Sequence, residues 1–118
     1  MTIPSRVMGS GNAPLSAQAI CGIATTGLTA TGSSTTDALQ LNNSYSVVGT
    51  TAASTGVKLV TTENGATCVV ANDGASTLTV YPRAGSTIDG GASVSIATGK
   101  RRVFWGTSDT TWVSLLGA

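Results

Sequence analysis

The stretch from residue 67 to residue 81, TCVVANDGASTLTVY, decides the fold class of this chain. Its two runs rich in valine and threonine, residues 67–71 and 78–81, are typical of strands, because β-branched side chains fit a pleated, half-buried surface. Asn72, Asp73 and Gly74 separate the runs, and these residue types accept the positive φ angles of tight turns. We therefore predict a β-hairpin with its tip at residues 72–74. Pro82 ends the second strand because proline cannot donate to a ladder.

Similar short runs extend outward from this stretch on both sides. They are separated by turn-forming residues at intervals of roughly 8–12 residues, a spacing typical of β-sandwiches and barrels. The further predicted strands cover residues 37–41, 45–48, 57–60, 94–96, 103–105 and 112–115. We expect an all-β protein in which residues 36–118 form a β-sandwich or jelly-roll-like domain. No internal sequence repeat aligns.

The first third of the chain has a different character. Residues 15–35 are rich in Thr, Ser, Ala and Gly and are predicted to be a connector. The start of this connector fits a short helix and a strand equally well, whereas Gly27 to Thr36 is predicted to be a loop.

Residues 1–14 are predicted to form an extended N-terminal arm. Their prolines and glycines, Pro4, Gly9, Gly11 and Pro14, prevent a continuous helix or a central strand. The arm nonetheless carries apolar side chains that a solvated tail would not need, and Arg6 could pair with a partner's carboxylate. We expect it to dock on a partner through Ile3, Arg6, Val7, Met8 and Leu15. The alternative is that it folds back on its own assembly.

Composition favours a contact role over a soluble monomer. Charged residues make up only 9% of the 118 residues, against about 25% in an ordinary soluble domain. Small residues replace them and lose little side-chain entropy on contact, which suits a permanent interface. The net charge of +1 favours neither a nucleic-acid nor an anionic-membrane partner. No apolar run approaches the ~20 residues of a membrane-spanning helix and no signal peptide opens the chain, so we expect assembly in a cytoplasm.

The residues that usually carry catalysis are scarce. The chain has no histidine, the commonest general base and metal ligand, and its acids Asp37, Glu63, Asp73, Asp89 and Asp109 stand alone in sequence. A glycosidase pair would need two of them to converge, and their spacing does not favour that. We expect no enzymatic activity, no cofactor and no metal site. The thiols Cys21 and Cys68 are predicted to be buried and unlinked, as expected of a chain that is not secreted.

Two further clusters have competing interpretations. Phe104, Trp105 and Trp112 are predicted to anchor the core of a C-terminal hairpin whose polar tip spans residues 107–110, and a carbohydrate-stacking platform is the alternative. The only charge run, residues 100–102, is predicted to be a solvated strand end. Its alternative role is a contact of Arg101 and Arg102 with an acidic partner surface.

A series of short pieces follows in order along the chain: Gly27-Leu28-Thr29-Ala30-Thr31-Gly32, Gly56-Val57-Lys58-Leu59, Val70-Ala71-Asn72, Leu78-Thr79-Val80-Tyr81-Pro82, Ile88-Asp89-Gly90, Ala97-Thr98-Gly99-Lys100 and Trp112. In this order the pieces resemble small structural proteins of tailed bacteriophages, the kind found among capsid decoration (cement) and head-fibre proteins. The resemblance covers most of the chain from residue 15 onward, and Arg101-Arg102 departs from the small neutral residues typical of that position.

The resemblance implies a virion structural protein, often a homotrimer. The leading expectation is a decoration protein on the capsid surface, assembled in the host cytoplasm, that bridges subunits of the major capsid protein. The alternative is a fibre or tail component that binds a host receptor or surface glycan. A virion carbohydrate hydrolase is a third reading, which the missing histidine disfavours.

Overall fold

The computed structural model describes Gly11 and residues 22–116, and the structural statements below concern those residues. Within residues 22–116 the chain forms ten strands and no helix, so no described helix could cross a membrane. The strands are β1 (Ala24–Thr29), β2 (Leu39–Gln40), β3 (Tyr45–Thr50), β4 (Gly56–Lys58), β5 (Thr67–Asn72), β6 (Leu78–Tyr81), β7 (Thr87–Ile88), β8 (Val94–Ile96), β9 (Arg101–Gly106) and β10 (Thr111–Leu116). The all-β prediction is confirmed.

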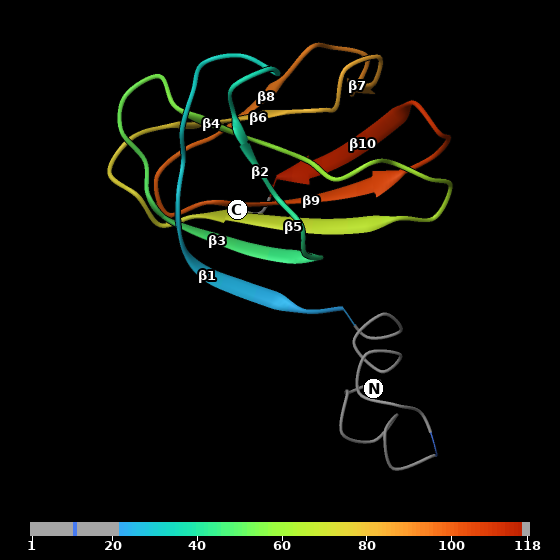
Figure 1. The fold of residues 1–118 in the computed structure, drawn as a ribbon, viewed down its shortest axis with the longest axis horizontal. Helices are drawn as coiled ribbons and strands as arrows, with labels where there is room; N and C mark the ends of the chain where they lie inside the picture. The colour runs from blue at the N-terminus through green and yellow to red at the C-terminus, as the bar shows by residue number, and fades with distance from the viewer. Residues whose placement is uncertain (1–10, 12–21, 117–118) are drawn as a thin grey trace.

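The strands form two layers that face each other (Figure 1). One sheet has six strands in the order β1-β3-β5-β9-β10-β7, and the other has four in the order β2-β4-β6-β8. From β1 to β6, consecutive strands alternate between the two sheets, and every pair that they form within a sheet is parallel. The path is therefore solenoid-like, with three coils. A jelly roll, by contrast, pairs its strands antiparallel.

The register shows how the coils stack. Ala24 lies opposite Tyr45 and Tyr45 opposite Val69, so equivalent positions are 21 and then 24 residues apart. In the smaller sheet, Leu39 lies opposite Val57 and Val57 opposite Val80. Because the coils differ in length and in residue type, the structural repeat leaves no alignable repeat in the sequence.

The second half of the chain closes this arrangement with antiparallel strands. β8 pairs with β6 at the edge of the smaller sheet, and β9 pairs with β5 in the larger one. β9 and β10 form the predicted C-terminal hairpin, with Trp105 opposite Val113, and β7 then pairs parallel to β10.

The hairpin predicted at residues 72–74 is wrong. β5 and β6, the strands on either side of it, belong to different sheets. Asn, Asp and Gly favour a change of chain direction, but they do not determine whether the chain returns along the same sheet or crosses to the other one. Here residues 73–77 carry the chain from the larger sheet to the smaller one.

The fully buried Asn72 side chain fixes this crossing. Its Oδ1 accepts hydrogen bonds from Thr51 Oγ1 at 2.9 Å and from the Gly74 amide at 3.0 Å. Its Nδ2 donates to the carbonyl oxygens of Ser76 and Ile96, both at 2.8 Å. Gly74 must be glycine because a Cβ there would overlap Thr51. Since Ile96 belongs to β8, Asn72 also joins the two sheets.

Residues 24–29 differ from expectation as well. Part of this segment was predicted to be loop, yet it forms β1, the edge strand of the larger sheet. Its threonines suit a strand. The pairing with β3 shifts register around Gly27, which has a positive φ of 70°, so glycine here marks an irregular strand instead of a loop. The two-residue strand β7 was also not predicted.

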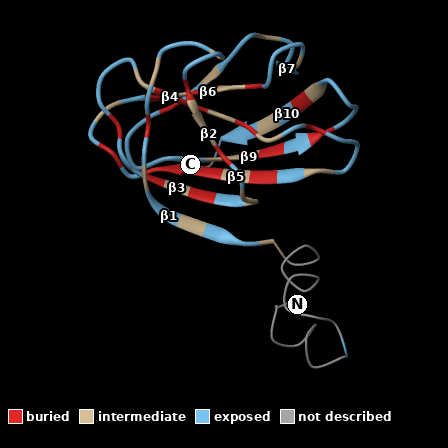
Figure 2. Cartoon of the chain, in the orientation of Figure 1, coloured by how far each residue is buried: buried red, intermediate tan, exposed pale blue. Residues whose placement is uncertain are grey.

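The core fills the space between the sheets (Figure 2). Phe104 and Trp112 are fully buried and meet edge to face, with ring centroids 6.5 Å apart. Trp105 is 40% exposed, which corrects its predicted place in the core. Adjacent residues of a strand point to opposite faces, so Phe104 and Trp105 cannot both face inward. The other core residues are mostly valine, leucine and isoleucine: Leu41, Val48, Val57, Leu59, Val70, Leu78, Val80, Ile88 and Ile96.

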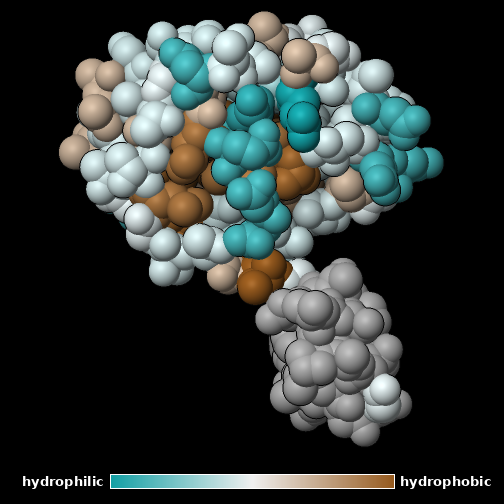
Figure 3. All heavy atoms as spheres, in the orientation of Figure 1, coloured by the Kyte–Doolittle hydropathy of each residue, from teal (hydrophilic) through white to brown (hydrophobic). Residues whose placement is uncertain are grey.

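The side of the molecule shown in Figure 3 has a mixed character. Hydrophobic side chains are visible in the layer between the two sheets, and a band of hydrophilic residues runs in front of them. This side includes β2, the edge strand of the smaller sheet (Figure 1). The core is thus partly covered here by polar side chains.

Candidate functional site

Most of the contact residues predicted from the sequence lie outside the described residues. Ile3, Arg6, Val7, Met8 and Leu15 are among these, and only Gly11 of the predicted arm is described. Cys21 also lies outside the described residues, and the unlinked state of the two thiols stays a prediction. Cys68 is buried on β5, and burial raises the pKa of its thiol to about 11.

Arg101 and Arg102 open β9 and point to opposite faces of the larger sheet, as adjacent strand residues do. Arg101 is exposed and lies 3.7 Å from the carboxylate of Asp73, so its charge is partly compensated within the chain. Exposed pairs of this kind contribute little to stability, about 0–1 kcal/mol. Arg101 therefore stays accessible to a partner.

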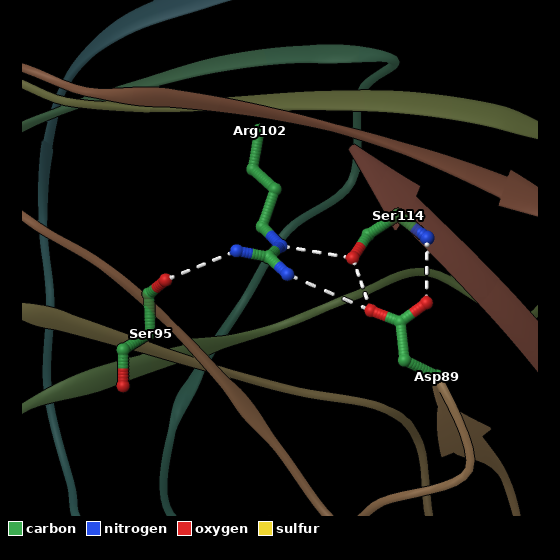
Figure 4. A network of polar contacts seen from close by, with 4 residues as sticks. All are labelled: Asp89, Ser95, Arg102 and Ser114. Carbon is green, nitrogen blue, oxygen red and sulfur yellow. Dashed lines mark hydrogen bonds and ion pairs between the residues drawn. The ribbon is translucent and has the colours of Figure 1, made fainter. Parts of the chain in front are cut away.

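Arg102 is held in a network of polar contacts within the chain (Figure 4). Its Nε donates to Ser114 Oγ at 2.8 Å, and its guanidinium lies 3.6 Å from Asp89 Oδ2. A third contact, 3.5 Å from the guanidinium to the carbonyl oxygen of Ser95, reaches β8 in the smaller sheet. The side chain is 18% exposed. Arg102 thus joins the two sheets, and its predicted contact with a partner remains untested.

Asp89 completes this network. The Ser114 amide donates to its Oδ1 at 2.9 Å, and the Ser114 hydroxyl donates to its Oδ2. Burial raises the pKa of Asp89, but the hydrogen bonds from Ser114 and the nearby charge of Arg102 outweigh this effect and leave the pKa lowered. The residue has a φ of 51°, a conformation that Asp tolerates better than most side chains. Asp89 is therefore a charged anchor for β10 and Arg102.

Three of the acids are engaged by groups of their own surroundings. Asp73 pairs with Arg101 and Asp89 with Arg102, whereas Asp37 Oδ1 accepts hydrogen bonds from residues 33 and 34 in its own turn. Hydrogen bonds from Ser34 lower the pKa of Asp37. No group of three or more His, Cys, Asp or Glu that could hold a metal ion occurs among the described residues.

The larger sheet turns an apolar surface away from the core. Tyr45, Val69, Val103 and Leu115 lie opposite one another, strand by strand, across β3, β5, β9 and β10. Trp105 and Val113 form the adjacent row with Thr67. We call Tyr45, Val69, Val103, Trp105, Val113 and Leu115 the outer face. Four of them are exposed: Tyr45 by 42%, Trp105 by 40%, Val113 by 37% and Leu115 by 61%.

The sequence analysis does not predict the outer face, although the sequence contains one pattern that indicates part of it. Residues 103–105, 112–113 and 115–116 are apolar at successive positions, so in each strand some apolar side chains must point away from the core. The row that they join is formed by strands distant in sequence. The local pattern therefore indicates exposed apolar side chains without indicating their neighbours.

Comparisons of the chain with protein-family models, with curated proteins and with solved structures find no match.

Proposed function

We propose that this chain is a structural protein of a tailed-bacteriophage virion, most specifically a capsid decoration protein that stabilises the head by bridging capsid subunits. The observation that carries the proposal is how charge and apolar surface are distributed. Arg101 and Arg102 are engaged with acids of their own chain, while the outer face is left apolar and almost uncharged. Exposed aromatic and aliphatic side chains gathered on one face are common in contacts between proteins.

The proposed partners are the major capsid protein of the same particle and further copies of this chain in a homotrimer, with no nucleic acid and no membrane. The proposed location is the capsid surface. We propose no catalytic activity and no cofactor. The proposal treats residues 36–118 as a β-sandwich domain and residues 1–14 as the arm that reaches the particle.

Imaging of the virus particle tests this proposal. The chain carries a short peptide tag at its C-terminus, and tagged particles are stained with gold-labelled antibody and examined by negative-stain microscopy. Label spread over the shell is the expected result. Particles that assemble without the tagged chain serve as the control for antibody background. Purified particles that contain none of the chain would exclude the virion role.

A fibre or tail component that binds a surface glycan is the second candidate. It is favoured by the exposed rings of Trp105 and Tyr45, since exposed aromatic rings are common stacking surfaces for sugars. Label confined to the tail would favour this role over decoration. A fluorescence change of wild-type protein on adding host surface polysaccharide, absent in Trp105→Ala, would support glycan contact directly.

A further inference from the structure

The outer face is broad, ordered and built from several strands. Four strands at about 4.8 Å spacing and five to six residues at about 3.3 Å rise give a flat area of roughly 300–400 Å². Two such faces therefore remove roughly 600–800 Å² of projected area, and side-chain relief increases the accessible area buried. The total lies below the ~1,200 Å² of standard stable interfaces, so a contact made by this face alone belongs to the small, weak class. Trp105 and Tyr45 add the aromatic anchors that carry most binding energy in such contacts.

The charge on this face restricts its partner. Within β3, β5, β9 and β10, Arg101 is the only charged side chain on the outer side, and it already pairs with Asp73. A partner surface rich in charged groups would leave them buried without counter-charges, which is strongly unfavourable. A glycan would need many hydrogen-bonding groups, whereas the two central rows offer only hydroxyls such as that of Thr67. The fitting partner is an apolar, uncharged and nearly flat surface.

A second copy of this chain supplies such a surface. β-Sheet faces pack at about 10 Å with their side chains interdigitated, and copies of the outer face have matching size and polarity, whether two meet about a two-fold axis or three about a three-fold axis. We propose that the outer face, Tyr45, Val69, Val103, Trp105, Val113 and Leu115, is the contact between copies of this chain. The inference extends the proposed virion function by assigning one of its proposed partners, the second copy, to a surface.

The test measures self-association of the full chain in solution, without particles. Sedimentation velocity and light scattering across the micromolar range should give the wild type a mass of two or more copies. Leu115→Arg should weaken the association at least about tenfold, because it places a charge in the buried contact. Ala92→Arg adds the same charge at an exposed position between β7 and β8 and should leave the association unchanged. A wild type that stays a single copy overturns the proposal, as does association that Leu115→Arg does not weaken.

A second variant and a fluorescence measurement test the same contact independently of Leu115→Arg. Val113→Thr keeps a β-branched side chain and removes apolar contact, so it tests the face even if Leu115→Arg fails to fold. Trp105 is exposed whereas Trp112 is buried, so a blue shift of the emission on association should come from Trp105. A single-copy protein whose particle binding is lost in Leu115→Arg would assign the face to the capsid and overturn the proposal. Self-association without particle labelling would instead reject the virion function and leave this contact standing.

Discussion

At the scale of single residues, Asn72 is where the chain leaves the larger sheet, and its side chain meets four partners in a buried position. Asn72→Ala would leave the Thr51 hydroxyl, the Gly74 amide and the carbonyls of Ser76 and Ile96 without these bonds. Buried polar groups left unpaired cost about 1–3 kcal/mol each before relaxation, so we expect a loss of about 3 kcal/mol in the free energy of unfolding. Urea denaturation of the variant and the wild type measures this difference in the free energy of unfolding.

Ser46→Ala is the matched control. Ser46 is also buried, but its hydroxyl has no hydrogen-bond partner within the described structure. Its removal should change stability by less than about 0.5 kcal/mol or increase it. An Asn72→Ala protein as stable as Ser46→Ala would contradict the role given to Asn72.

The lowered pKa of Asp89 predicts how the free energy of unfolding changes with pH. Its pKa in the folded chain is lowered from the ordinary value of 3.8, so its ionised form stabilises the fold above that value. This stability is lost as the pH falls through the lowered pKa. Asp89→Asn should therefore be less stable than wild type at neutral pH and should lose less on acidification below about pH 4. Asp109→Asn, which removes an equal charge from the exposed tip of the β9–β10 hairpin, is the matched control variant.

Cys68 is predicted to be inert in the folded protein, because its thiol is buried and its raised pKa of about 11 leaves little thiolate at neutral pH. Alkylation followed by intact-mass measurement without reductant should leave Cys68 unmodified in the native chain. After unfolding, both Cys68 and Cys21 should be labelled. A chain that takes up no label when unfolded contains a disulfide, contrary to the prediction.

At the scale of elements, the N-terminal arm is expected to attach the protein to its particle. Ordering an extended arm costs ~1–2 kcal/mol per residue in backbone entropy, and each buried apolar side chain offsets about 1.5–3 kcal/mol. Deletion of residues 2–12 removes Ile3, Arg6, Val7 and Met8 and should abolish particle binding while the oligomer stays intact.

The readouts of this deletion separate its alternatives. Particle binding is measured by co-sedimentation and the oligomer by light scattering. Unchanged binding would remove the attachment role. Loss of the oligomer itself would mean that the arm folds back on its own assembly.

At the scale of the whole molecule, β5 ties the two halves together. It pairs parallel with β3 of the coiled half and antiparallel with β9 of the closing half. Because β5 pairs with strands of both halves, unfolding of either half would remove pairing from the other. We therefore expect a single cooperative unfolding transition. The far-UV circular dichroism spectrum of the native protein should show dominant β-structure. The unfolding midpoint followed by circular dichroism should match the midpoint followed by the fluorescence of the buried Trp112. Two separate midpoints, or a spectrum dominated by helix, would contradict this prediction.

The sequence by itself determined the all-β class and most of the strands. β6 and β8 lie where they were predicted, and β3, β5, β9 and β10 extend the predicted runs by a few residues. These features depend on side-chain alternation and turn residues, which act over a few neighbouring positions. The burial of Cys68, Phe104 and Trp112 could also be predicted, because free cysteines and aromatic rings favour the core whatever their neighbours.

Only the tertiary structure decided which strands pair and which surface is left open. The Asn72–Gly74 turn could have closed a hairpin, yet it crosses between the sheets because Asn72 finds partners near Thr51 and Ile96, more than 20 residues away in each direction. The outer face likewise joins Tyr45 to Leu115 through registers between distant strands. Such pairings follow from how the buried sides of all the coils fit together, and no local window of sequence contains that information.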